Sequence, residues 1–114
     1  MNSEELFEAL DKLLIEGEES FLVKIRSLGI FDKDQFDSIL KLIRTIPSTA
    51  DKDDCLKIKR GHFDSLLYLM PALINGANFL AEPEFRKQAQ HGIGQLSGAF
   101  TSAFYDEPPE KKQI

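Results

Sequence analysis

The sequence has a single cysteine, a short longest hydrophobic run and no basic N-terminal segment, and each absence excludes a class of protein. One cysteine, Cys55, can form neither a disulfide within the chain nor a cysteine-based zinc site. The longest apolar run, residues 66–74, is well short of the roughly 18 residues that cross a bilayer. The first residues are acidic where a signal peptide is basic. We therefore expect a cytoplasmic protein with no membrane segment, no metal site and no cofactor.

The charge balance argues against another class of function. The chain has 114 residues with 14 basic and 19 acidic side chains, giving a net charge of −5. Phosphate-rich surfaces attract positive proteins, so binding to nucleic acid or to an anionic membrane is not expected. A composition of 42% apolar and 29% charged residues is typical of a folded soluble domain. This length predicts one domain over residues 1–106, followed by a flexible tail over residues 107–114 that contains Pro108 and Pro109.

The spacing of apolar residues predicts an all-α fold. No stretch alternates apolar and polar residues as a strand does, and apolar positions recur every three or four residues instead. We expect helices over residues 3–28, from a cap at Asp32 to Pro47, over residues 62–80 with a kink at Pro71, and over residues 83–105. Residues 48–61 are expected to form a loop that runs into a helical turn. The result is an antiparallel bundle of four helices, or of five if Pro71 divides the third.

Local signals support these boundaries. Asp32 and Gln35 have the spacing of a capping box, and Phe31 and Phe36 have that of a hydrophobic staple. Gly29 is suited to end the first helix, whose apolar phase continues across Gly17. The core positions that we expect in this helix run from Phe7 to Leu28, and those in the third include Phe63, Leu66, Leu67, Met70, Leu73 and Ile74.

The last predicted helix is rich in glycine. Gly94, Gly98 and Ser102 lie four residues apart, and Gly92 precedes them. Each interior glycine costs about 0.8–1 kcal/mol relative to alanine. A face that admits another backbone gains from such residues, so we infer that this helix is covered on two sides, either within the fold or at a subunit interface. Gly94, Gly98 and Ser102 are thus a candidate self-association surface of a homo-oligomer. The alternative is that these glycines are tolerated without a packing role.

One short motif suggests catalysis. The segment Arg86-Lys-Gln-Ala-Gln-His91 places a histidine five residues after an arginine, and it resembles the motif of HEPN ribonuclease domains. Those domains are all-helical and often dimeric. The resemblance, which covers six residues, implies that His91 acts as general base or acid in metal-independent RNA cleavage and that Arg86 stabilises the phosphate. The alternative is that Arg86 and His91 belong to the solvated polar face of an amphipathic helix.

The predicted first helix is strongly acidic. Its first part, residues 4–19, contains one lysine against seven acidic residues, Glu4, Glu5, Glu8, Asp11, Glu16, Glu18 and Glu19. Ile15 and Leu22 add an apolar line beside the main stripe, which either widens the core face or contacts a partner. We interpret Glu8, Asp11, Ile15, Glu18 and Leu22 as a surface for a basic protein partner, as in immunity, inhibitor or counter-defence proteins, where charge speeds association. The alternatives are a merely solvated helix, the ribonuclease, and a structural subunit of a larger assembly.

Overall fold

The computed structural model describes residues 1–104, and over this range it contains helices and no strand. The helical elements are α1 (Ser3–Ile15), α2 (Phe21–Leu28), α3 (Lys33–Thr45), the short 3-10 helix η1 (Ile46–Thr49), α4 (Arg60–Ala77) and α5 (Pro83–Phe104). The predicted all-α bundle is confirmed. The predicted tail over residues 107–114 lies outside the described residues.

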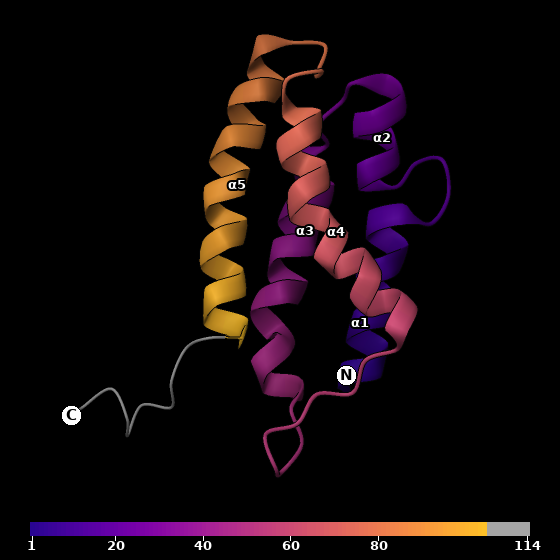
Figure 1. The fold of residues 1–114 in the computed structure, drawn as a ribbon, viewed down its shortest axis with the longest axis vertical. Helices are drawn as coiled ribbons and strands as arrows, with labels where there is room; N and C mark the ends of the chain where they lie inside the picture. Colours follow the sequence, from indigo (N-terminus) through magenta and orange to yellow (C-terminus); the bar gives the residue numbers. More distant parts are fainter. Residues whose placement is uncertain (105–114) are drawn as a thin grey trace, which may run out of the picture.

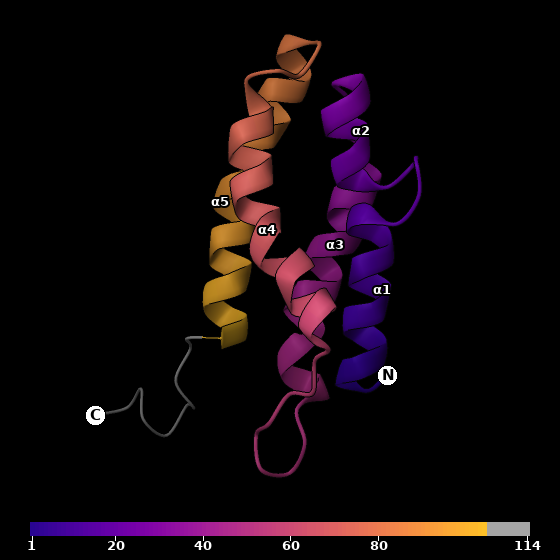
Figure 2. The ribbon, with the colours of Figure 1, turned by 45° about the vertical axis from the view of Figure 1, so that its right-hand side comes forward.

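The helices occupy four corners of a bundle. α1 and α2 follow one another along one corner, and consecutive corners run in opposite directions along the long axis (Figure 1). α1 packs on α3 and α4, and α5 packs on the same two helices, so α3 and α4 lie at opposite corners. The connection between them passes around one end of the bundle (Figure 2). The backbone N–H of Lys57 donates to Ser3 Oγ at 2.9 Å and fastens this connection to the start of α1.

The core is apolar and is contributed by every helix. Apolar burial of this kind is the main stabilising contribution to the fold. The largest fully buried side chains are Leu6, Leu10, Leu14, Phe21, Phe36, Ile39, Ile43, Ile46, Leu69, Leu73 and Leu96.

The expected core positions are wrong at a few places. Leu28 is exposed in the last turn of α2, and Phe63, Leu67 and Ile74 are exposed on α4. In α4 the buried row is Leu66, Leu69, Leu73 and Ala77. The buried side of α4 is therefore rotated about the helix axis from the expected one. Most of the circumference of α4 is apolar, so the spacing of its apolar residues does not show which side is buried.

The first predicted helix is in fact two helices, and this corrects the expected span of residues 3–28. α1 ends at Ile15 and α2 begins at Phe21, because Gly17 adopts a φ of +85° that cannot continue a right-handed helix. Ser20 Oγ donates to the Gly17 carbonyl at 2.9 Å and stabilises the turn. Both helices bury apolar side chains in the same core, so the spacing of apolar residues in the sequence does not change at the break. The fifth helix therefore arises here, whereas α4 continues through Pro71 and bends (Figure 2).

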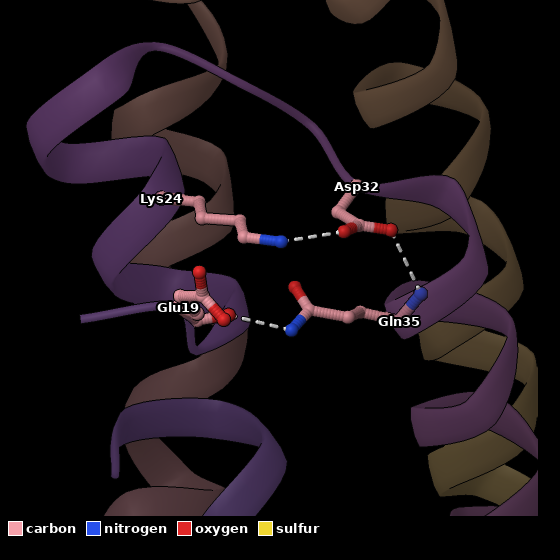
Figure 3. Close-up of polar contacts among 4 residues, drawn as sticks. All are labelled: Glu19, Lys24, Asp32 and Gln35. Carbon is pink, nitrogen blue, oxygen red and sulfur yellow. Dashed lines mark hydrogen bonds and ion pairs between the residues drawn. The ribbon is translucent and has the colours of Figure 1, made fainter. Parts of the chain in front are cut away.

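Polar contacts join α2 and the preceding loop to the start of α3 (Figure 3). The Asp32 carboxylate accepts the Gln35 backbone N–H at 3.1 Å, which confirms the expected cap. The Gln35 side chain does not return to the cap but donates to the Glu19 carbonyl at 2.6 Å, so the capping box is only half formed. Lys24 Nζ lies 2.7 Å from the other Asp32 oxygen. The expected staple is present, since the rings of Phe31 and Phe36 are 5.1 Å apart.

The segment 48–61 forms a loop that runs into a helical turn, as expected, since no helix lies between η1 and the start of α4 at Arg60. After η1 the chain turns at residues 51–55, where the Asp51 carboxylate accepts the backbone N–H groups of Asp53 and Cys55 at 2.8 and 2.9 Å. An aspartate that bonds its own backbone in this way stabilises a turn in competition with a helix.

α5 approaches α3 closely at Gly92. A Cβ atom built on Gly92 would lie 2.8 Å from the ring of Phe36, whereas one built on Gly94 or Gly98 meets no atom within 4 Å. Phe36 is buried against Phe21 and Phe31, so its ring has little room to move. Gly92 is therefore a requirement of the fold.

Gly92→Ala tests this contact. The methyl group should lower the free energy of unfolding by about 1–2 kcal/mol, because overpacking outweighs the better helix propensity of alanine. Gly61→Ala is the matched control, since its Cβ would enter open space in α4, and it should stabilise by about 0.5–1 kcal/mol. Chemical denaturation of both variants measures the difference. A Gly92→Ala protein as stable as the Gly61→Ala protein would contradict the account.

The Lys24–Asp32 pair predicts a dependence of stability on pH. The hydrogen bond from Lys24, followed by that from the Gln35 backbone, lowers the pKa of Asp32 below its usual value. Its contribution to stability is complete above the unfolded-state pKa of about 3.9, and it is lost as the pH falls through the lower folded-state pKa.

Lys24→Met should therefore reduce the free energy of unfolding by about 1 kcal/mol at neutral pH, and the difference from the wild type should shrink below about pH 4. Lys33→Met removes an exposed pair with Asp37 at 2.9 Å and should cost less than about 0.5 kcal/mol. Urea titrations at several pH values measure both. An effect of Lys24→Met that stays constant down to pH 2 would contradict the assignment.

Candidate functional site

An apolar groove opens between α2 and α4. It has a volume of about 510 Å³ and is lined by Ile15, Leu22, Val23, Ile25, Arg26, Tyr68, Ala72, Asn75, Gly76 and Phe79. Two of its aromatic side chains face solvent, and Phe79 is 82% exposed. Large exposed apolar side chains gathered around a concavity are typical of binding surfaces.

The sequence builds this groove through a close contact between helices. A Cβ on Gly76 would lie 2.7 Å from Cγ2 of Ile25, so glycine allows α2 to pack directly onto the backbone of α4. Tyr68, Ala72 and Asn75 follow at helical spacing along one side of α4. Phe79 lies just beyond the helix, where its backbone N–H donates to the Gly76 carbonyl at 3.0 Å. The contact between Gly76 and Ile25 therefore forms the floor of the groove, and Phe79 lies at its rim.

The structure brings together two of the predicted partner-binding residues. Ile15 is exposed at the end of α1 and Leu22 is only 7% exposed, yet both line the groove. Leu22 therefore belongs to the core and to the groove wall. Glu8 and Asp11 precede Ile15 by seven and four residues on α1 and so share its face. Glu18 is exposed in the loop between α1 and α2, outside the groove lining.

The predicted self-association residues lie elsewhere. Gly94, Gly98 and Ser102 are exposed on α5, where they line a shallow hollow with a volume of about 450 Å³ beside Arg44 of α3. Gly94 and Gly98 have nothing within 4 Å of an added Cβ, so the expectation that the fold itself covers this face is wrong. Self-association through these residues stays a prediction.

Arg86 and His91 do not meet within the chain. Arg86 Nη1 donates to the Leu80 carbonyl at 3.0 Å and holds the turn between α4 and α5. His91 is exposed and lines a separate hollow of about 230 Å³, in which Lys33 and Lys87 take part and Arg86 does not. Residues five apart on a helix point about 140° away from one another, which explains the separation. The arginine therefore has a structural role, and the geometry of one chain gives the ribonuclease interpretation no support.

A second apolar groove escaped the sequence reasoning. It lies between α4 and α5, has a volume of about 430 Å³, and is lined only by Phe63, Leu66, Leu67, Met70, Phe100 and Phe104. A signal for it exists in the sequence. Residues 65–81 and 88–104 contain no lysine, arginine, aspartate or glutamate, although both stretches form helices with exposed faces.

Among residues 1–104, no cluster of three or more histidine, cysteine, aspartate or glutamate side chains could hold a metal ion. Over the same range, no helix combines the length and the apolar character needed to cross a membrane.

Two variants distinguish a structural role of Arg86 from a catalytic one. Arg86→Met should lower the free energy of unfolding by about 1–2 kcal/mol, because the Leu80 carbonyl loses its charged donor. His91→Ala should change it by less than about 0.5 kcal/mol, since the side chain is exposed. Thermal melts measure both, with an RNA-cleavage assay on the same proteins. Unchanged stability of Arg86→Met, together with cleavage that His91→Ala abolishes, would reverse the assignment.

Comparison with known protein families, with curated proteins and with solved structures finds no match to this chain.

Proposed function

We propose that the chain is a protein-interaction module that binds a basic partner in the groove between α2 and α4. The observation that carries this proposal is the exposure of Phe79 and Tyr68 around a concave apolar surface, beside the acidic face of α1. The groove supplies affinity, and the acidic side chains select the sign of the partner's charge. Such a protein acts by occupying its partner's surface, as inhibitors and immunity proteins of the cytoplasm do.

The apolar part of the groove contributes to the binding free energy. Covering a phenylalanine such as Phe79 contributes about 1.5–3 kcal/mol. Tyrosine is common among the residues that dominate binding energy, and Tyr68 lies inside the groove beside Ala72. A partner that inserts one or two apolar side chains between Ile15 and Phe79 would gain affinity without rearranging the bundle.

The charges support a basic partner. Glu16, Glu18 and Glu19 are exposed in the loop that follows Ile15, and Glu8 and Asp11 lie on the face of α1 that leads to it. Lys12, which lies 3.8 Å from Glu8, offsets part of this charge, and Arg26, the one charged residue in the groove lining, offsets another part. Exposed charges of one sign raise the rate of association with an oppositely charged protein and make that rate sensitive to salt.

Affinity capture from the source cells, followed by titration of the captured protein, tests the proposal. Phe79→Ser should weaken binding by about tenfold, equivalent to about 1.4 kcal/mol. Replacing Glu16, Glu18 and Glu19 with glutamine should slow association and reduce its dependence on salt.

Leu67→Ser is the matched control, because Leu67 is an exposed apolar residue of α4 that does not line this groove. It should leave the affinity unchanged, and melting curves should show all variants folded. Capture of an acidic protein, or equal loss of affinity in Leu67→Ser and Phe79→Ser, would overturn the proposal.

A further inference from the structure

The α4–α5 hairpin differs in charge from the rest of the protein. Residues 1–64 contain 24 charged side chains, whereas residues 65–104 contain four, which are Glu82 in the connection between the two helices and Glu84, Arg86 and Lys87 in the first turns of α5. Helices that face water normally alternate apolar and charged faces. The outer side of this hairpin therefore has the residue composition of a protein–protein interface.

The apolar side chains on this surface form a row along α4. Phe63, Leu67, Met70 and Ile74 follow at helical spacing on the side that faces α5. Leu67 is 60% exposed and Ile74 is 48% exposed. Tyr68 and Asn75 lie on the opposite side of Pro71 and belong to the groove with α2. α4 thus presents two separate apolar surfaces, and the one toward α5 takes no part in the function proposed above.

The charge of the chain favours a second copy of itself as the occupant. Two copies each carry a net charge of −5 and repel one another, so a contact between them is favoured where acidic side chains are few. Arg60 and Asp64, in the first turns of α4, are the charged residues of that helix, whereas α1 is acidic along its length. An unlike partner is usually selected by complementary charges, and beyond Asp64 this face has few to offer. Interfaces between identical subunits are correspondingly the more apolar class.

The row is also complementary to itself. A two-fold axis between Leu67 and Met70 pairs the two copies of α4 in opposite directions, and it places Ile74 of each copy beside Phe63 of the other. Phe63 lies at the groove of about 430 Å³ between α4 and α5, and Ile74 is the one exposed residue of the row that does not line it. Each copy therefore supplies both a groove and the side chain that fills it.

The size of the face fits a reversible dimer. Two helices about 10 Å apart and roughly 25 Å long offer roughly 500 Å² per copy. The total of roughly 1,000 Å² is close to the lower limit for a specific interface. We infer that the chain forms a two-fold dimer through Phe63, Leu67, Met70 and Ile74 of α4, with the groove against α5 receiving Ile74 of the second copy.

Sedimentation velocity over a range of concentrations tests this inference. The wild type should shift with concentration from the 12.9 kDa monomer toward twice that mass. Leu67→Glu should raise the dissociation constant of the dimer at least about tenfold, because two carboxylates then face each other across the axis. Ile15→Glu in the other groove and Ser102→Glu on the glycine face of α5 should dimerise like the wild type.

Mixing Leu67→Glu with Leu67→Lys distinguishes loss of the interface from loss of the fold. Each variant alone should be monomeric, and the equimolar mixture should recover a species of dimeric mass, because opposite charges meet at the axis. A wild type that stays monomeric at every concentration would overturn the inference. So would dissociation by Ser102→Glu but not by Leu67→Glu, which would place the contact on the glycine face.

Discussion

The packing of Phe36 against the backbone of Gly92 is the contact on which the rest of the structure depends. It lets α5 approach α3 so closely that a methyl group at residue 92 would lie 2.8 Å from the ring. The ring is held in place by Phe21 and Phe31, which come from the start of α2 and from the residue before the α3 cap. One aromatic cluster therefore joins α2, α3 and α5. α4 completes the bundle from the opposite corner, where it contacts α1, α2 and α5, and no other part of residues 1–104 covers its outer side.

The arrangement of α4 separates two surfaces on one helix. Its buried row of leucines binds it to the core, and Pro71 marks the middle of the exposed side between the two apolar rows. On one side, Gly76 draws α2 close and forms the groove that ends in Phe79. On the other side, the absence of charge continues across to α5. We propose that the first surface, beside acidic residues, binds a basic protein and that the second binds an identical copy. The two surfaces share no lining residue.

The sequence predicts the helical fold well because caps and apolar periodicity act locally. Asp32 and the Phe31–Phe36 staple appear in the structure as their spacing indicates. The break at Gly17 was missed because α1 and α2 bury the same side, so periodicity does not change across it. Gln35 could not be assigned correctly, since its partner is the carbonyl of Glu19, sixteen residues away in the sequence.

The candidate site could be predicted only in part. Ile15 and Leu22 were recognisable as an apolar line outside the main stripe, but Tyr68 and Phe79 reach the same groove through tertiary packing alone. For Arg86, a motif resemblance cannot show that the guanidinium donates a hydrogen bond to the Leu80 carbonyl, because that contact depends on how the chain turns before α5. The groove between α4 and α5 does have a signal in the sequence, which is a lack of charged residues. The long uncharged stretches of α4 and α5 are visible in the sequence, although their meaning depends on knowing which side faces solvent.

The central claim is that the outer surface of α4 is covered on its α5 side by a second copy of the chain. The most direct measurement is the solvent accessibility of individual methyl groups, by paramagnetic relaxation in NMR at low and high protein concentration. The methyl groups of Leu67 and Ile74 should become protected as the concentration rises, while those of Ile15 stay accessible. Leu67 and Ile74 methyl groups that remain as accessible as Ile15 at every concentration would contradict the account.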